Sequence, residues 1–549
     1  MNHRVFSFVG IFVVAAAVLL VGRLSFSAEV SAAPPDDLLA YSTGFNALTD
    51  QPPESLNTAD LINLAFANGE IDRDTANLYL MYAINGEGDV PKQYQSDVLW
   101  DATATMRQLS KTLDQMQSRS AQRAIDHFLT GACESSNSSL TTIHNSTNFH
   151  IEYSTISVGL TIDDYVTSLE TAWTKEVDQF GWAAPPVGPN PPPGNRYHVR
   201  IDTLNGTVVG FVYHLGDHGG LVGDNPNTAW DDVDAYASCM VLRNDYTNIS
   251  FNPQALLNAT TSHELVHSIQ FGYGILTGDN ATEDAFVEGA ASWMEDEVFD
   301  NANDNYGYLW PSFDMCMGEY TYNPYRYWIT WRGLTERYGS GTPGGSEQVW
   351  QDYMESVSQN STDNSLSALN AALVNQGTTL ADAFHAYAIA VKHNKTCGGN
   401  HTYPYCFEEG ANYVSVTGEP AVHGQIDNIG EAYSGSIQDN YAINWVSLPT
   451  DTPPYTLTVI NNSPTAELQL SVVCDVGDIM FGQGNSAVIS GHQTVGLSDY
   501  DPTGCNTVTL IVTNQRQTAA DPSTCTAHNY MVWTTEDKYE HIFMPIIYK

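Results

Sequence analysis

The feature that most constrains the fold of this chain is a pair of histidines four residues apart, followed further on by a glutamate. The pair lies in the segment His263-Glu264-Leu265-Val266-His267, and the glutamate is Glu288. On a helix, side chains at positions i and i+4 project from the same face, so both imidazoles can reach one point. If Glu288 reaches that point as well, two helices must pack closely against each other.

The residues around this motif predict those two helices. Asn252 and Pro253 have the pattern of a helix start, because proline fits the first helical position, where its missing N–H group is not needed. Gly272 provides the stop. A second helix is expected to begin at Thr282 as its N-cap, with acidic residues in its first turn. Small residues at 289–291 would let the two helices approach closely.

Two imidazoles and one carboxylate are a ligand set of hydrolytic zinc sites, which have three protein ligands and one open position. His263, His267 and Glu288 are therefore the expected zinc ligands. Glu264 lies beside the ligand face of the helix, where it can act as the general base toward a zinc-activated water. The alternative is a buried helix with two surface histidines and a solvated Glu288.

The motif, its spacer and the segment Glu288-Gly289-Ala290-Ala291-Ser292-Trp293-Met294-Glu295 resemble the gluzincins, which are zinc peptidases with two His ligands and one Glu ligand. The wider region from Leu61 to about Gly435 is similar to a family of exported bacterial metalloproteases, most of them uncharacterised. Only the motif and the Glu288 segment are sharply specific. The resemblance implies a zincin-like domain that hydrolyses peptide bonds.

Two parts of the expected site depart from the gluzincin pattern or stay open. Many gluzincins have an aspartate four positions after the glutamate ligand, which supports a histidine; here that position is Ser292, and Glu295 or Asp296 could substitute. Gluzincins often stabilise the oxyanion with a Tyr or His side chain. The tyrosine candidates, for each of which packing is the alternative role, are Tyr273, Tyr320, Tyr322, Tyr325 and Tyr327.

The N-terminus predicts export. A basic start, an apolar run from Val5 to Gly22 and small residues after it are typical of a secretory signal, which we expect at residues 1–33. An uncleaved membrane anchor is the alternative, since the run is almost long enough to span a bilayer. The chain has 8 cysteines, which fits an oxidising exterior. Cys397 and Cys406 are expected to pair, and so are two of the three residues Cys474, Cys505 and Cys525.

The charge of the chain limits its partners. It has 63 acidic and 20 basic residues, a net charge of −43. Nucleic acids and anionic membranes are bound through basic patches, so a protein or peptide is the expected partner; the sequence does not indicate an oligomeric state. Acidic clusters at Asp231–Asp234 and at Asp279 could hold structural calcium (Ca²⁺), but they lack the EF-hand spacing, and solvated loops are the alternative.

The texture of the chain predicts an α+β protein. Residues 34–140 form a helical N-terminal region, with helical stretches near 61–82 and 106–129, and this region is either an inhibitory prosegment or a permanent subdomain. Residues 141–435 form the zincin-like metallopeptidase domain, with a mixed sheet, the motif helix and a mostly helical second half. Residues 436–549 form a β-sandwich, with strands near 455–460, 468–473 and 507–512.

Two functions follow from these features. The first is a secreted zinc metallopeptidase, an endopeptidase by preference, because the sequence has no clear segment that would hold the free amine of an aminopeptidase substrate. The second is a non-catalytic exported surface or adhesion protein that retains the zincin fold and binds through its C-terminal β-domain. Glu264 favours the first, because a structural metal site needs no general base.

Overall fold

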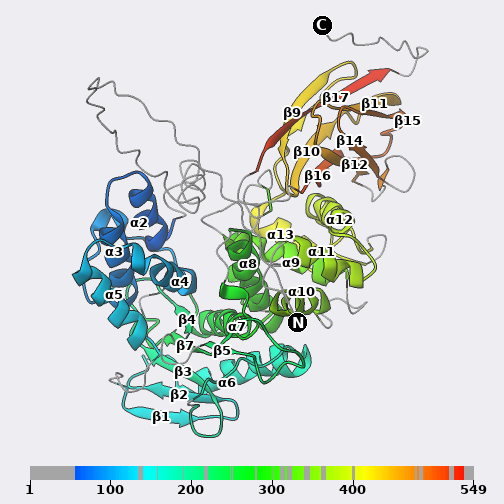
Figure 1. The fold of residues 1–549 in the computed structure, drawn as a ribbon. Coiled ribbons are helices and arrows are strands. Elements are labelled where there is room, and N and C mark those ends of the chain that lie inside the picture. The colour runs from blue at the N-terminus through cyan, green and yellow to red at the C-terminus, as the bar shows by residue number, and fades with distance from the viewer. Residues whose placement is uncertain are drawn as a thin grey trace, which may run out of the picture.

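The computed structural model describes residues 56–133, 140–157, 159–189, 191–214, 221–247, 249, 251–277, 281–300, 302–308, 316–317, 324–338, 347–359, 366–398, 402–475, 479–480, 486–517 and 525–536. These residues form an α+β structure with several sheets and a β-rich C-terminal region, which confirms the expected fold class at this level. N-terminal helices (blue) and C-terminal strands (orange and red) lie at opposite ends of the view in Figure 1, with the green helices between them. The expected signal segment lies outside the described residues.

Four helices make up the N-terminal region. They are α2 (Thr58–Ala67), α3 (Arg73–Asn85), α4 (Thr103–Thr112) and α5 (Arg119–Gly131). The helical stretch expected over 106–129 is therefore two helices rather than one. The chain breaks there because Ser118 starts a new helix, with its side chain accepting a hydrogen bond from the Ala121 N–H group.

The central sheet has five strands in the order β1-β2-β3-β7-β4. The strands are β1 (Thr142–Asn145), β2 (Phe149–Tyr153), β3 (Tyr197–Asp202), β4 (Gly210–His214) and β7 (Ser238–Arg243); β5 (Leu221–Gly223) and β6 (Ala235–Tyr236) pair separately. Strands β2, β3 and β7 are parallel, whereas β1 and β4 run antiparallel to their neighbours. The antiparallel strand β4 is thus one edge of the sheet.

At strands β4 and β7, apolar side chains lie on both faces of the sheet, because successive residues of a strand point to opposite faces. Val212, Met240 and Leu242 pack on one side into the core that contains helix α7. Phe211 and Val241 point the other way, into the core built by the N-terminal helices. The N-terminal region therefore covers one face of the sheet at strands β4 and β7.

The α-helices that follow the N-terminal region in the described residues lie mostly between the central sheet and the C-terminal strands. They are α6 (Ile162–Trp173), which precedes β3, then α7 (Pro253–Gly272), α8 (Ala281–Val298), α9 (Trp328–Thr335), α10 (Gln348–Gln359), α11 (Leu366–Asn375), α12 (Leu380–His393) and α13 (Gly410–Thr417). The expected start of α7 is confirmed: Pro253 is at its first turn, and the Asn252 side chain accepts from the N–H groups of Gln254 and Ala255. Helix α8 begins at Ala281, one residue before the expected N-cap Thr282.

The C-terminal region consists of two sheets around a shared apolar core. One sheet has the order β13-β12-β16-β10-β8, with β14 also on β12, and the other has the order β15-β11-β17-β9. The strands are β8 (Gly424–Gln425), β9 (Ala432–Gln438), β10 (Ala442–Leu448), β11 (Tyr455–Asn461), β12 (Glu467–Cys474), β13 (Ile479–Met480), β14 (Ala487–Ser490), β15 (Thr494–Tyr500), β16 (Val508–Asn514) and β17 (Ala527–Glu536). The three strands expected from sequence are β11, β12 and β16.

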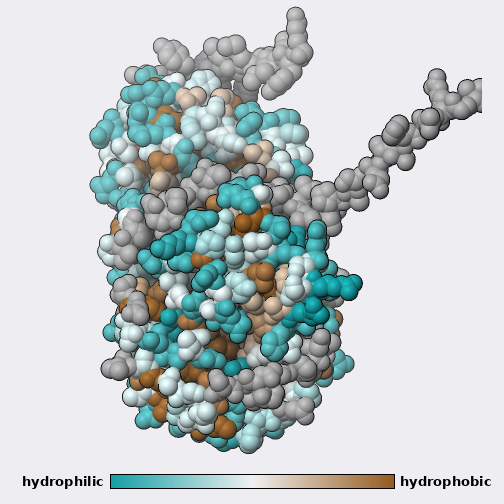
Figure 2. Space-filling model, turned by 90° about the vertical axis from the view of Figure 1, so that its left-hand side faces the viewer, coloured by the Kyte–Doolittle hydropathy of each residue, from teal (hydrophilic) through white to brown (hydrophobic). Residues whose placement is uncertain are grey.

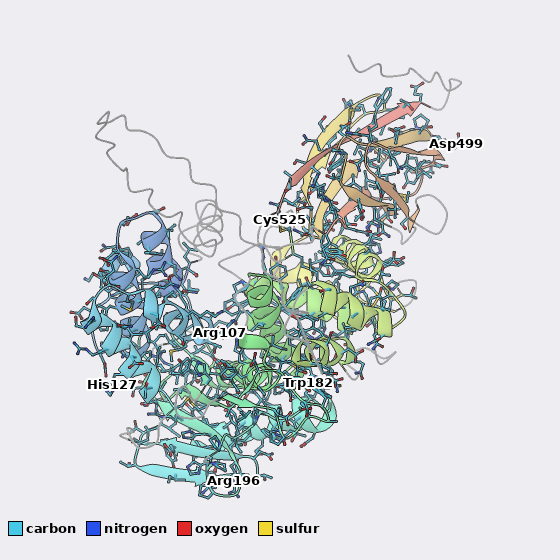
Figure 3. All side chains as sticks on the ribbon, viewed as in Figure 1. Arg107, His127, Trp182, Arg196, Asp499 and Cys525 are labelled. Carbon is cyan, nitrogen blue, oxygen red and sulfur yellow. A yellow bond between two sulfur atoms is a disulfide. The ribbon has the colours of Figure 1, made fainter. Side chains whose placement is uncertain are left out.

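Four disulfides join the chain. They are Cys133–Cys239, Cys316–Cys525, Cys397–Cys406 and Cys474–Cys505. The last two confirm the pairs expected from sequence, and all four fit an extracellular protein. Cys525 lies at the end of the C-terminal region that faces the helices (Figure 3), so its bond to Cys316 ties the two parts together.

Hydrophobic and hydrophilic residues are scattered over the side of the molecule drawn in Figure 2. Among the residues that the structure describes, no helix is both long and apolar enough to cross a bilayer.

His385 on α12 connects the helices to the C-terminal region. It is buried, its Nδ1 lies 2.8 Å from Thr513 Oγ1, and its Nε2 lies 2.9 Å from Ser471 Oγ. Both partners are on strands of the larger C-terminal sheet. Burial lowers the pKa of His385 from 6.5 to about 3, so the folded protein holds this imidazole neutral.

The neutral His385 should make stability depend on pH. Below pH 6.5 the unfolded chain binds a proton at this residue that the folded chain does not, so the free energy of unfolding should fall by about 1.4 kcal/mol per pH unit from this residue alone. Thermal unfolding of wild type and His385→Gln between pH 7 and pH 5 checks this. His385→Gln should melt lower at pH 7 but lose less on acidification. The control His127→Gln, at an exposed histidine on α5, should keep the wild-type slope; equal slopes in all three proteins would contradict the assignment.

Candidate metal centre

Helices α7 and α8 bring the expected site residues together. His263, Glu264 and His267 lie on α7, Glu288 lies on α8, and all four side chains are buried. Glycine is needed beside the last of these, because a Cβ atom on Gly289 would lie 2.6 Å from the Cβ of Tyr327. The turn Pro324–Tyr327 thereby lies directly against α8.

The ligand atoms of this group are close enough to share one ion. His263 Nε2 and His267 Nε2 are 3.0 Å apart, and Glu288 Oε2 lies 3.5 Å and 3.2 Å from them, respectively. Asp101, from the segment before α4, joins the group with its Oδ2 3.5 Å from His263 Nε2. The four ligand atoms all lie within 4.8 Å of one another.

These separations fit a small divalent metal. Zinc bound tetrahedrally at about 2.0–2.1 Å would hold its ligand atoms roughly 3.3–3.4 Å apart. Both oxygens of Glu288 are buried without a hydrogen-bond donor among the described residues. A buried carboxylate left in that state is costly, and a metal ion would satisfy it.

The other nitrogen of each histidine is held in place. His263 Nδ1 lies 2.6 Å from Glu295 Oε1, and His267 Nδ1 lies 2.8 Å from Gln270 Oε1. Since these oxygens accept, each Nδ1 donates, and the Nε2 of a neutral ring presents a lone pair to the cluster. Two such lone pairs facing each other at 3.0 Å repel unless a cation or a proton lies between them.

Glu295 therefore has the supporting role that the sequence left open between two acids. The second acid, Asp296, instead forms an ion pair with Arg332 at 2.9 Å. Ser292, which occupies the usual position of the supporting aspartate, is buried, and its hydroxyl has no partner among the described residues.

The surroundings favour positive charge at His263 and disfavour further negative charge. Burial alone would lower the pKa of His263, but the carboxylates of Asp101, Glu288 and Glu295 raise it well above its ordinary value. Burial would raise the pKa of Glu288, but the two histidines together lower it. For Glu264, burial and then the charge of Asp101 raise the pKa well above its usual range. A divalent cation bound here would offset the negative charge of these buried carboxylates.

Glu264 lies beside the ligand cluster and close to the edge strand of the sheet. Its Oε2 accepts a hydrogen bond from Thr103 Oγ1 at 3.0 Å, while its Oε1 has no partner among the described residues. A Cβ atom on Gly210 of β4 would lie 3.0 Å from that Oε1. Glycine at this position therefore lets β4 run close to the carboxylate.

Asp101 is a site residue that the sequence did not indicate. An aspartate just before a helix has the pattern of a helix cap, and Asp101 does accept a hydrogen bond from the Thr103 N–H group at 3.0 Å through Oδ1. Nothing in the sequence shows that its Oδ2 faces residues more than 150 positions away. Only the three-dimensional packing of α4 against the sheet reveals it.

Of the tyrosine candidates, Tyr325 lies at the site. Its hydroxyl donates to Asp101 Oδ2, and its ring centroid is 5.9 Å from that of His263. The hydroxyl of Tyr273 instead accepts from Ala183 N, and that of Tyr327 donates to the Cys316 carbonyl. Tyr320 and Tyr322 lie outside the described residues.

The acidic segments considered for calcium have other partners or are not described. Asp232 accepts hydrogen bonds from Asn225 N, Thr228 Oγ1 and Trp230 Nε1, so its carboxylate organises a loop. Asp279 lies outside the described residues. The Asp101, His263, His267 and Glu288 group is the one metal-competent cluster found in the part of the chain that the structure describes.

Comparisons with known proteins add little to this geometry. No protein-family model and no curated protein matches the chain. Among solved structures, the pre-peptidase C-terminal domain of a collagenase from Bacillus anthracis is similar over 21% of this chain and 99% of that chain, with 6% sequence identity and a TM-score of 0.14. A likeness this weak carries no weight for fold or activity, so the chemistry of the site must be argued from its own residues.

Removing the support of His263 should weaken metal binding without abolishing it. In Glu295→Ala the Nδ1 of His263 loses its acceptor, so the ring is free to reorient, and the loss of such a partner typically costs about 10–100-fold in metal affinity. Competition of the purified protein with a chromophoric zinc chelator measures this. The control Asp300→Ala, at an exposed acid after α8, should bind zinc as the wild type does. Unchanged affinity in Glu295→Ala would remove Glu295 from the site.

Proposed function

We propose that this chain is an exported zinc-dependent peptidase of the gluzincin type. The observation that carries the proposal is the arrangement of two imidazole Nε2 atoms and the buried Glu288 carboxylate at spacings of 3.0–3.5 Å. His263, His267 and Glu288 would hold the zinc ion. Glu264 next to them is the feature that a purely structural metal site does not need.

The residues around the cluster have roles that fit peptide hydrolysis. When bound, zinc would supply a Lewis acid at this point. Glu264 would accept a proton from the attacking water and later deliver it to the leaving nitrogen. The Tyr325 hydroxyl, which donates toward the cluster, would hydrogen-bond the substrate carbonyl oxygen as it gains negative charge.

A peptide is the substrate that the neighbourhood favours. Strand β4 is an edge strand that runs past Glu264, and the backbone of an edge strand can pair with an extended chain. Trp100 already pairs with the chain at the start of this edge, through a parallel bridge to Val208. The edge can therefore bind an extended backbone next to the general base.

The second candidate is a non-catalytic exported surface protein in which the metal is structural. Asp101 is the observation that favours it, because it would complete four protein ligands, and structural zinc sites are closed in this way. In that case binding would be left to the C-terminal β-rich region.

Glu264→Gln should keep zinc and lose peptide hydrolysis. The amide has nearly the same shape as the carboxylate and can still accept from Thr103, but it cannot take a proton from water. Loss of a general base costs about 10²–10⁴-fold in rate, and the same group would also serve the leaving amine, so the upper end is expected. Cleavage of a peptide library, with zinc content measured on the same samples, provides the test.

The assay is run on intact protein and on protein after limited proteolysis, since the N-terminal region lies against the site. Equal cleavage by wild type and Glu264→Gln would exclude Glu264 as the base. No cleavage by any wild-type preparation, with zinc bound, would exclude the peptidase and leave the structural site.

A further inference from the structure

A short segment of the N-terminal region occupies the edge of the central sheet beside the candidate site. Trp100 pairs with Val208 in parallel orientation, with Val209 N donating to Trp100 O at 3.0 Å. Ala102 N donates to Gly210 O at 2.9 Å, and Val212 N donates to Thr103 Oγ1 at 2.8 Å. Residues 100–103 thus use the hydrogen-bonding groups of β4 that an extended peptide would need; we call them the edge segment.

The edge segment is firmly docked. Trp100 is 4% exposed, Asp101 is 7% exposed, and Ala102 and Thr103 are fully buried. A loop that only passes near a site would stay exposed to solvent, whereas these four residues are packed against the rest of the protein.

The side chains of the edge segment occupy the reactive end of the site. Asp101 Oδ2 lies 3.5 Å from His263 Nε2 and accepts the hydrogen bond of the Tyr325 hydroxyl. A substrate carbonyl oxygen would need the same position, next to the metal that His263 would hold and within reach of the Tyr325 hydroxyl. Two residues on, Thr103 donates to Glu264 and so engages the carboxylate that would otherwise contact water.

From these contacts we propose that Asp101 is the fourth metal ligand and that the edge segment holds the site in a latent form. Asp101 fills the coordination position. The backbone of Trp100 and Ala102 and the side chain of Thr103 fill the peptide-binding edge. The inference deepens, and rests on, the proposed peptidase function. Asp101 is a ligand that substrate must displace and takes no part in bond cleavage.

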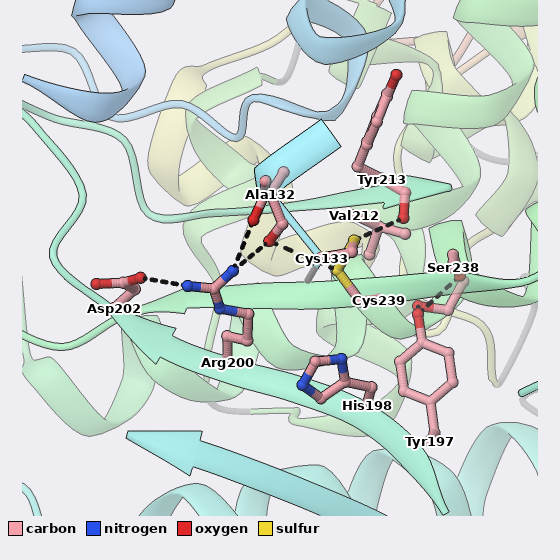
Figure 4. The surroundings of a disulfide bond; sticks show 12 residues. Ala132, Cys133, Tyr197, His198, Arg200, Asp202, Val212, Tyr213, Ser238 and Cys239 are labelled. Carbon is pink, nitrogen blue, oxygen red and sulfur yellow. Dashed lines mark hydrogen bonds and ion pairs between the residues drawn. A yellow bond between two sulfur atoms is a disulfide. The ribbon is translucent and has the colours of Figure 1, made fainter. Parts of the chain in front are cut away.

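The helices that carry the edge segment are fastened to the sheet. Cys133, after α5, is bonded to Cys239 on β7, and Arg200 on β3 donates to the carbonyls of Gly131 and Ala132 (Figure 4). Arg107 on α4, labelled in Figure 3, donates to the Leu276 carbonyl at 3.1 Å.

Loss of the whole N-terminal region would also expose one apolar face of the sheet. That face is made by Leu204, Val208, Phe211, Tyr213, Cys239 and Val241. Activation therefore requires the edge segment, including the first residue of α4, to move off β4 while the rest of the helices stays in place. The region is a permanent subdomain that carries an inhibitory segment, which combines the two roles that the sequence left open.

Asp101→Asn tests the coordination directly. The amide keeps the Oδ1 acceptor for Thr103 N, so the segment should still fold, but it is a poor metal ligand. Full-length wild type and variant are loaded with Co²⁺, and acetohydroxamate is titrated while the visible spectrum of the metal is recorded. If the Asp101-bound form makes up at least nine-tenths of the wild type, Asp101→Asn should bind acetohydroxamate about tenfold more tightly or better.

The matched control is Asp97→Asn, the same change at an exposed position four residues earlier. It should bind acetohydroxamate as the wild type does. Equal affinity in wild type and Asp101→Asn, with the fold checked by circular dichroism, would overturn the inference.

Peptide cleavage measured on the same samples separates this inference from the proposed function. Tighter acetohydroxamate binding by Asp101→Asn without cleavage would support Asp101 as a ligand and reject the peptidase. Cleavage by the wild type, with acetohydroxamate affinity unchanged in Asp101→Asn, would support the peptidase and reject the latent form.

Discussion

The packing of α7 against α8 depends on the balance of buried charge between these two helices. Asp101, Glu264, Glu288 and Glu295 are all nearly or fully removed from water and surround two imidazoles. An unpaired buried carboxylate costs several kcal/mol, so this group of acids needs positive charge or protons beside it. A divalent cation, or protons in its place, is what makes this packing of helices tolerable. The sheet, the turn at Pro324–Tyr327 and the N-terminal helices are arranged around that point.

The local parts of this arrangement could be predicted from sequence. The i, i+4 spacing of His263 and His267 fixes their common face, and the Asn252 cap and Pro253 fix where α7 begins. Strands β11, β12 and β16 were likewise readable. β11 alternates with a period of two, as a half-buried strand does, whereas β12 and β16 are buried along almost their whole length and show as short apolar, β-branched runs bounded by turn residues. Each of these signals is contained within a few residues.

Asp101 could not be predicted in this way. Its signal is a common one, an acid before a helix, and its position opposite His263 depends on how α4 docks against β4. The choice between Glu295 and Asp296 had the same difficulty, because both lie one helical turn beyond Ser292 and only the side on which Arg332 packs separates them. Contacts between distant segments depend on packing that no local pattern encodes.

The connectivity of the disulfides implies an order in which they can form as the chain is synthesised. Cys316 pairs with Cys525, whereas Cys397–Cys406 and Cys474–Cys505 both lie between them in the sequence. A chain that emerges from its N-terminus presents Cys316 to four other thiols before its own partner arrives. Closing this 209-residue separation also removes unfolded-state entropy worth on the order of 5 kcal/mol in the chain-entropy model. The Cys316–Cys525 bond is thus the last of the four that can form, and oxidation that outpaces synthesis would trap Cys316 with the wrong thiol.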